Sequence, residues 1–105
     1  MLYLDESNNE HEIELGVGEE FELHLPENPT TGFRWKCIAN GGSACVLQSD
    51  NFETAGRTPG RGGIHLWRFK AAQVGLANFD FVYQRSFEQA DKYAKRFRLR
   101  ARIHH

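Results

Sequence analysis

Thiol and imidazole side chains are the groups in this chain that could support covalent chemistry. A nucleophilic site needs a thiol beside a general base, and the chain offers Cys37 and Cys45 as thiols and His24 and His65 as bases. Nothing in their spacing brings a cysteine to a histidine, so catalysis is the less favoured interpretation. These histidines and His11 also lack the spacing of a metal site. We therefore expect no catalytic residue and no bound metal.

The two cysteines flank a short turn at Asn40–Ser43. If that turn joins a hairpin, Cys37 lies opposite Val46. Cys45 then lies opposite Ile38, and the two thiols face different sides of the sheet, which disfavours a disulfide. We expect two free, mostly buried thiols.

The stretch from Asn28 to Trp35, Asn-Pro-Thr-Thr-Gly-Phe-Arg-Trp, predicts a stiff loop of defined shape. Pro29 fixes its own φ and favours an extended residue before it. Gly32 allows a positive φ, and the two threonines carry hydroxyls that can bond the local backbone. Phe33 and Trp35 then begin a strand. Because such residues are common in any turn, this stretch alone leaves an ordinary turn open.

Composition restricts the classes of protein that fit. With 105 residues, 40% of them hydrophobic and 26% charged, the chain predicts one soluble globular domain over residues 1–105. A formal charge of −1 argues against nucleic-acid binding, and no apolar run approaches the roughly 20 residues that cross a bilayer. Met1–Asp5 does not read as a signal peptide. The chain then acts inside the cell or has lost a leader, which leaves its compartment open. The terminal His104 and His105 resemble the end of a purification tag and are not considered as site residues.

Alternating apolar and polar residues predict strands throughout the chain, and no segment has sustained helical spacing. The expected strands are a split first strand within residues 1–15, then 21–25, 33–39, 44–48, 63–71, 77–83 and 97–103. About seven short strands indicate an all-β, immunoglobulin-like antiparallel β-sandwich. The last strand alternates apolar residues with arginines from Arg96 to Arg102. We interpret this basic face as solvated and paired with Glu12, Glu14 or Glu22.

The order of short and long connections predicts a binding edge. If successive strands run antiparallel, alternate connections lie at opposite ends of the sandwich. The short turns then share one end, and the longer connections Pro26–Gly32, Asp50–Gly62 and Arg85–Lys92 share the other. A rigid scaffold that presents several loops together is a common way to bind a partner.

Three of these segments resemble the signatures of one family, the chagasin-like inhibitors of papain-type cysteine proteases. Asn28, Pro29, Thr30, Thr31, Gly32 and Phe33 are similar to the first signature. Gly60, Arg61, Gly62 and Gly63, ahead of Trp67-Arg68-Phe69, resemble the second, a Gly-x-Gly element before a strand. Arg85, Ser86 and Phe87 resemble the third, where the family pattern is Arg-Pro-Trp.

The resemblance implies a protein inhibitor, a monomer when free, whose partner is a papain-like cysteine protease. In this family three loops form a wedge that enters the protease active-site cleft. The middle element, here Asn28–Phe33, lies over the catalytic cysteine and histidine of the partner. Inhibition is reversible and noncovalent, so no cofactor is implied, and neither nucleic acid nor membrane is an expected partner. The alternative is an adhesion or carbohydrate-binding sandwich that uses the same loops without blocking an enzyme.

Three positions depart from the family pattern. Arg61 stands where the family tends to be apolar, Ser86 replaces proline and Phe87 replaces tryptophan. Ser86 makes the third loop less rigid. Phe87 is either a contact residue at the binding edge or a core residue that caps the sandwich. Arg85 is either a contact or the solvated end of a strand.

Overall fold

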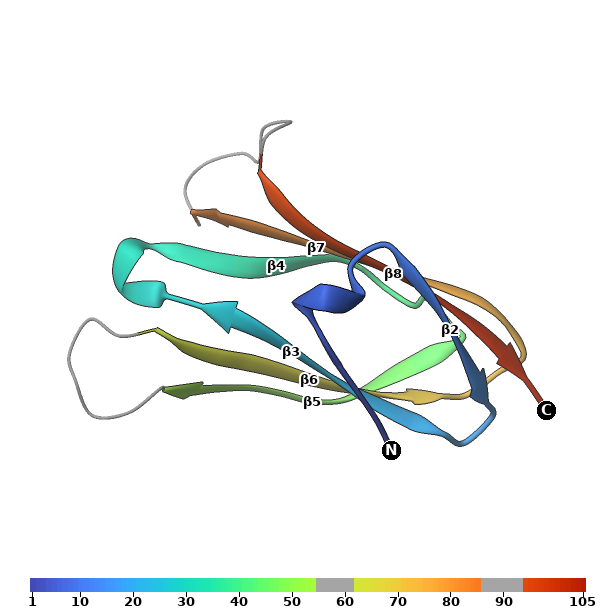
Figure 1. Cartoon of the computed structure of the whole chain (residues 1–105). Coiled ribbons are helices and arrows are strands. Elements are labelled where there is room, and N and C mark those ends of the chain that lie inside the picture. The colour runs from blue at the N-terminus through green and yellow to red at the C-terminus, as the bar shows by residue number, and fades with distance from the viewer. Residues whose placement is uncertain (55–61, 86–93) are drawn as a thin grey trace.

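Two four-stranded sheets pack face to face in the computed structural model, which describes residues 1–54, 62–85 and 94–105 (Figure 1). The strands are β1 Leu2–Asp5, β2 His11–Gly16, β3 Glu20–Glu27, β4 Phe33–Asn40, β5 Cys45–Thr54, β6 Gly63–Ala71, β7 Gly75–Arg85 and β8 Lys95–His104. Two short 3₁₀ turns, η1 Glu6–Asn8 and η2 Pro29–Thr31, are the helical elements of this described part. The arrangement confirms the predicted all-β sandwich.

The two sheets have the strand orders β1-β3-β6-β5 and β2-β8-β7-β4. Pairing is antiparallel except where β1 joins β3 and where β2 joins β8. The expected split first strand is therefore two strands that belong to different sheets. Between them, the Asp5 side chain accepts hydrogen bonds from the backbone and hydroxyl of Ser7, and Glu10 has a left-handed φ of 65°. These local features turn the chain from one sheet to the other.

Aromatic rings from both sheets form the centre of the core. Phe21 of β3 lies 5.3 Å from Phe69 of β6 and 5.2 Å from Phe79 of β7, measured between ring centroids. All three are buried. These rings occupy the inward positions of the alternating patterns, so the period of two in the sequence correctly identified the buried faces of β3, β6 and β7.

The expected hairpin between β4 and β5 does not form. β4 pairs with β7 and β5 pairs with β6, so the turn after Asn40 crosses from one sheet to the other. The predicted opposition of Cys37 to Val46 was therefore wrong. Both cysteines are free as expected, but Cys37 is exposed and only Cys45 is buried, because Cys37 lies on an edge strand.

Several strands also extend further than the sequence predicted, and Arg85 ends β7 rather than beginning a loop. β5 continues to Thr54, so Asp50 and the four residues after it belong to a strand rather than to a loop. β3 continues through Pro26 to Glu27. β1 pairs with β3 only as far as His24, so that edge of β3 is unpaired at Pro26. A residue without a backbone N–H is tolerated at such an edge.

The strand register brings the ends of three strands and the starts of three others to one end of the sandwich. Gly63 pairs with both Glu27 and Thr54, and Phe33 pairs with Arg85. Tyr83 pairs with Lys95 at the start of β8, and Figure 1 shows η2 at this end. The common edge is confirmed for these strand ends, while 55–61 and 86–93 lie outside the described residues.

Candidate functional site

The η2 loop is held in shape by its own hydrogen bonds. The Asn28 Oδ1 accepts from the backbone N–H of Thr30 at 3.2 Å and from its hydroxyl at 2.5 Å. The Thr31 hydroxyl donates to the Asn28 carbonyl at 2.7 Å, and the Gly32 N–H donates to the Pro29 carbonyl at 2.9 Å. Gly32 ends the turn at a φ of 85°, in the left-handed region. The predicted stiff loop is thus confirmed, in the form of a capped helical turn.

Tyr83 of β7 holds the start of this loop against the sheet that contains β4 and β7. Its hydroxyl accepts a hydrogen bond of 2.8 Å from the Asn28 N–H. Its ring lies 5.4 Å from that of Phe33 and 4.9 Å from that of Trp35. The Arg85 guanidinium lies over the Phe33 ring, 5.1 Å from its centroid. The sequence placed Tyr83 at the end of a predicted strand and at the start of the segment that resembles the third signature, but its contact with the loop was not predicted.

A buried carboxylate lies directly below the loop. The Glu27 carboxylate accepts a 2.7 Å hydrogen bond from the Trp35 N–H, and its oxygens lie 3.1 and 3.2 Å from the His65 Nδ1. The other ring nitrogen of His65 contacts Asp50, and the ring stacks on Trp67. Sequence reasoning missed this cluster because Glu27 and His65 are 38 positions apart and no motif joins them.

Gly62 and Gly63 have reasons within the protein for lacking a side chain. A Cβ on Gly62 would lie 2.7 Å from the carbonyl oxygen of Glu27, and one on Gly63 would overlap the carbonyl oxygen of Glu53. Close approach of Gly62 and Gly63 to neighbouring strands is therefore part of how this end is built. Beside it lies a shallow hollow of about 440 Å³, lined by Pro26, Glu27, Asn28, Gly62, Gly63, Tyr83 and Lys95.

The described members of the predicted site lie at one end of the sandwich. They are Asn28, Pro29, Thr30, Thr31, Gly32, Phe33, Gly62, Gly63 and Arg85. Gly63 is buried between β3 and β5, whereas Arg85 is exposed. Gly60, Arg61, Ser86 and Phe87 lie outside the described residues.

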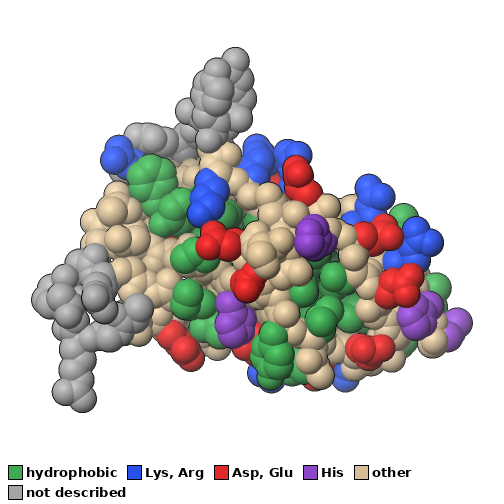
Figure 2. Space-filling view, in the orientation of Figure 1, with side chains coloured by type: hydrophobic (Ala, Val, Ile, Leu, Met, Phe, Trp, Pro, Cys, Tyr) green, Lys and Arg blue, Asp and Glu red, His purple; other side chains and the backbone are tan. Residues whose placement is uncertain are grey.

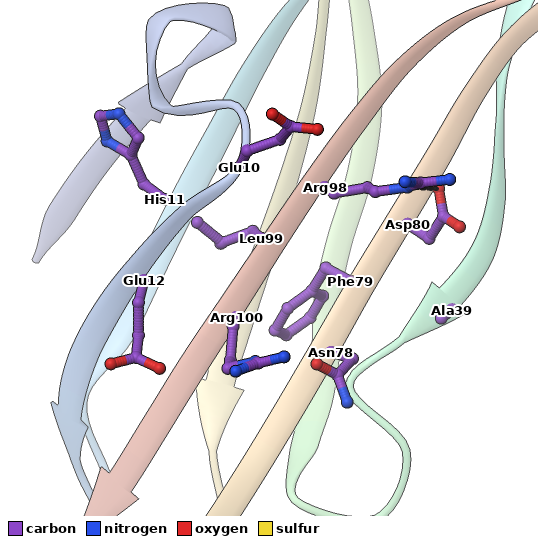
Figure 3. A pocket seen from close by; sticks show the side chains of 10 residues that line it. All are labelled: Glu10, His11, Glu12, Ala39, Asn78, Phe79, Asp80, Arg98, Leu99 and Arg100. Atoms are coloured by element: carbon purple, nitrogen blue, oxygen red, sulfur yellow. Dashed lines mark ion pairs between the residues drawn. The ribbon is translucent and has the colours of Figure 1, made fainter.

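A second hollow, of about 540 Å³, lies away from this end on the outer face of β2, β8, β7 and β4 (Figure 3). Charges of opposite sign pair with each other here. Asp80 lies 3.3 Å from Arg96 and 3.9 Å from Arg98, and Glu12 lies 3.7 Å from Arg102. Figure 2 shows both signs of charge interspersed over the face it presents. Glu12 pairs with the basic face as expected, and Asp80 was an unexpected partner.

Neither thiol has the surroundings of a nucleophile. Burial raises the pKa of the Cys45 thiol to about 11. Although Cys37 is exposed to solvent on one side, desolvation by its neighbours, with the negative charges of Asp50 and Asp80, also raises the pKa of its thiol. A raised pKa disfavours the reactive thiolate. In the described ranges, no group of three or more His, Cys, Asp or Glu side chains is placed to hold a metal ion, and no helix is long and apolar enough to span a membrane.

Together, these features define a loop-presenting β-sandwich of the immunoglobulin-like class, with one loop stiffened at the end where three strands end and three begin. A family model described as the chagasin family peptidase inhibitor I42 matches residues 14–101. The chain therefore belongs to the chagasin family of peptidase inhibitors. This membership supports inhibition rather than the adhesion or carbohydrate-binding alternative. No curated protein matches the chain.

Solved structures share the fold. The cysteine protease inhibitor EhICP2 from Entamoeba histolytica is similar with a TM-score of 0.81 and 19% identity, over 97% of this chain and 93% of that one. The Leishmania mexicana inhibitor ICP has a TM-score of 0.60 and 28% identity, over 92% of each chain. PbICP-C, solved in complex with falcipain-2, has a TM-score of 0.65 and 15% identity, over 98% of this chain and 99% of that one.

Proposed function

We propose that this protein is a reversible inhibitor of papain-like cysteine proteases, and that the loop end of the sandwich enters the protease active-site cleft. The contact surface in this proposal is built on Asn28–Phe33, with Gly62 and Arg85 beside it. Gly63 supports this surface from below because it is buried. Gly60, Arg61, Ser86 and Phe87 belong to the same proposed surface through their place in the second and third signatures.

The observation that carries the proposal is the internal bonding of the η2 loop in a member of an inhibitor family. A loop that is already ordered loses little conformational entropy when it binds, so more of the contact energy becomes affinity. Nanomolar binding corresponds to roughly −12 kcal/mol, and stable complexes usually bury about 800 Å² per partner. Three neighbouring loops can supply an area of this size.

The partner class is supported by the relatives. EhICP2 is described as a cysteine protease inhibitor, and PbICP-C was solved bound to falcipain-2. We infer that the chain has no catalytic activity of its own, since it belongs to a family of peptidase inhibitors. Inhibition then depends on surface complementarity and needs neither a covalent bond nor a cofactor. The free protein is a monomer in this proposal.

Titration of papain with the purified protein tests the proposal. We expect a stoichiometric loss of turnover that is restored on dilution, with trypsin as a control protease that stays active. A variant carrying Cys37→Ser and Cys45→Ser should inhibit as well as the wild type, because the thiols take no part. If several papain-like proteases keep full turnover in the presence of excess protein, the adhesion or carbohydrate-binding alternative replaces this function.

A further inference from the structure

Glu27 is the one buried charged residue in the described part of the chain, with 3% of its surface exposed. A carboxylate is costly to bury unless it is hydrogen-bonded and its charge is balanced. Its oxygens receive the Trp35 N–H at 2.7 Å and lie 3.1 and 3.2 Å from the Nδ1 of His65. The carboxylate is therefore satisfied by groups from two other strands.

These contacts surround the base of the η2 loop. Glu27 is the last residue of β3 before the loop, and Trp35 is the third residue of β4 after it. The Trp35 indole Nε1 also donates a 2.7 Å hydrogen bond to the carbonyl of Pro26. The strands that enter and leave the loop belong to different sheets, so the Glu27 carboxylate and the Trp35 indole join the two sheets where the loop begins.

His65 extends this connection to the second pair of strands at the same end. Its Nδ1 contacts Glu27 of β3 and its Nε2 contacts Asp50 of β5. The ring is stacked on Trp67, with centroids 3.9 Å apart and planes 6° from parallel, and Phe52 of β5 lies edge-on at 6.5 Å. The ring plane is thus fixed from two sides.

The two carboxylates determine which form of the ring fits. A neutral imidazole has one donor nitrogen and one acceptor nitrogen, whereas the protonated ring donates from both. Because both nitrogens of His65 face carboxylate oxygens, only the protonated ring makes both contacts favourable. Its positive charge also balances part of the negative charge of Glu27 and Asp50, and the stacked Trp67 adds a cation–π contact.

We infer that His65, in contact with Glu27 through one ring nitrogen and with Asp50 through the other, is a positioning residue that fixes the base of the η2 loop relative to the neighbouring ends of β5 and β6. This inference rests on the proposed inhibitory function, since it concerns the geometry of the same edge. An inhibitor that enters a cleft with several loops needs those loops at fixed relative positions, and loosening them adds an ordering cost to binding. Inhibition should weaken when His65 is replaced, and it should be weaker at higher pH, because only the charged ring makes both carboxylate contacts favourable.

The test compares two histidine variants that remove the same kind of contact. His65→Gln removes the charge at the loop end. His24→Gln is the matched control, because His24 contacts Glu22 at 2.6 Å in the middle of β3, away from the loop. We expect His65→Gln to raise the inhibition constant for papain by about tenfold or more, mainly through faster dissociation. His24→Gln should leave that constant unchanged.

A pH profile separates positioning from a merely structural role. The ratio of the inhibition constants of His65→Gln and wild type is measured at each pH, so that ionisation of the protease cancels. We expect this ratio to fall towards one as the pH rises, because the contacts to both carboxylates need the charged ring. Asp50→Asn provides a second variant that should fold, since the Asp50 side chain is 49% exposed, and it should also weaken inhibition.

The outcomes distinguish this inference from the proposed function. If the wild type does not inhibit any papain-like protease, the proposed function fails. If the wild type inhibits and Asp50→Asn and a folded His65→Gln inhibit equally well at every pH, the positioning role is overturned while the function stands. A nitrogen-15 NMR spectrum of the imidazole rings gives a readout without the protease. A spectrum in which the His65 ring never carries a proton on both nitrogens, at any pH at which the protein stays folded, would also overturn the inference.

Discussion

At the scale of single residues, Gly32 determines the shape of the η2 loop through its backbone. Its φ of 85° is one that side chains with a Cβ disfavour, especially β-branched ones. Space is not the constraint, because a Cβ at this position would meet only the Cγ of Arg85, at 3.9 Å. The requirement for glycine is therefore conformational, and a substitution tests loop shape without disturbing the core.

Replacing Gly32 by valine should abolish tight inhibition while the fold survives. A left-handed φ costs a residue with a Cβ about 1–2 kcal/mol, which a domain with a stability of about 5–15 kcal/mol tolerates. The loop should relieve this strain by changing its shape. The inhibition constant for papain should therefore rise by about tenfold or more. Circular dichroism checks the fold, and a titration of papain checks the inhibition.

Gly32→Asn is the matched variant, because asparagine adopts left-handed conformations more readily than other residues with a Cβ. It should retain most of the inhibition that Gly32→Val loses. If the valine variant inhibits as strongly as the wild type, the shape of this loop has no bearing on binding.

At the scale of elements, the pairing of β6 with β3 and β5 places Gly63, the last residue of the second signature, beside Glu27, which directly precedes the first. Gly63 pairs with Thr54 of β5 on one side and with Glu27 of β3 on the other. A Cβ here would overlap the carbonyl oxygen of Glu53 and lie 2.8 Å from the ring of Phe52. The resemblance placed Gly63 among the residues that contact the protease, and the structure gives this glycine a reason within the sheet.

We therefore expect Gly63→Ala to destabilise the protein by about 1–3 kcal/mol, as an overpacked site does. Urea unfolding measures this loss as a lower midpoint with an unchanged slope. Gly42→Ala is the control, since a Cβ there meets no atom within 4 Å and costs only the left-handed backbone, about 1–2 kcal/mol. A Gly63→Ala variant with the midpoint of the wild type would show that β5 and β6 separate easily at this end.

At the scale of the whole molecule, paired charges on the outer faces of the two sheets make stability depend on pH. The Arg68 guanidinium donates to the Glu22 carboxylate at 2.8 and 3.1 Å. This contact lowers the pKa of Glu22 despite partial burial, with a further contribution from His24. Hydrogen bonds from Ser7 lower the pKa of Asp5. A lowered pKa stabilises the fold above the ordinary range of that carboxyl, and the stabilisation is lost as the pH falls through the lowered value.

Acid should therefore reduce the free energy of unfolding, and Glu22→Gln should remove part of this dependence. We expect the variant to be less stable than the wild type at neutral pH by about 1 kcal/mol or less, as is usual for exposed ion pairs. The two should converge as the pH falls below about 4, where glutamate is protonated in the unfolded chain. Urea unfolding at a series of pH values measures both curves, and parallel curves would exclude a contribution from this pair.

The sequence by itself determined the kind of fold and the form of the first loop. Alternation with a period of two identifies buried positions such as Phe21 and Phe79 without knowledge of their neighbours, because it depends only on the geometry of a single strand. The turn from Asn28 to Gly32 was predictable for the same reason, since its capping bonds are made within five residues.

Only the tertiary structure decided which strands pair and which polar groups meet below the loop. Alternation assigns a face to a strand but not a partner, so it could not show that β1 and β2 separate or that β4 and β5 belong to different sheets. Glu27, His65 and Asp50 come from three strands and meet because burial of one carboxylate requires donors within hydrogen-bond reach. Residues far apart in the sequence supply these donors, so no local sequence pattern could predict the contact.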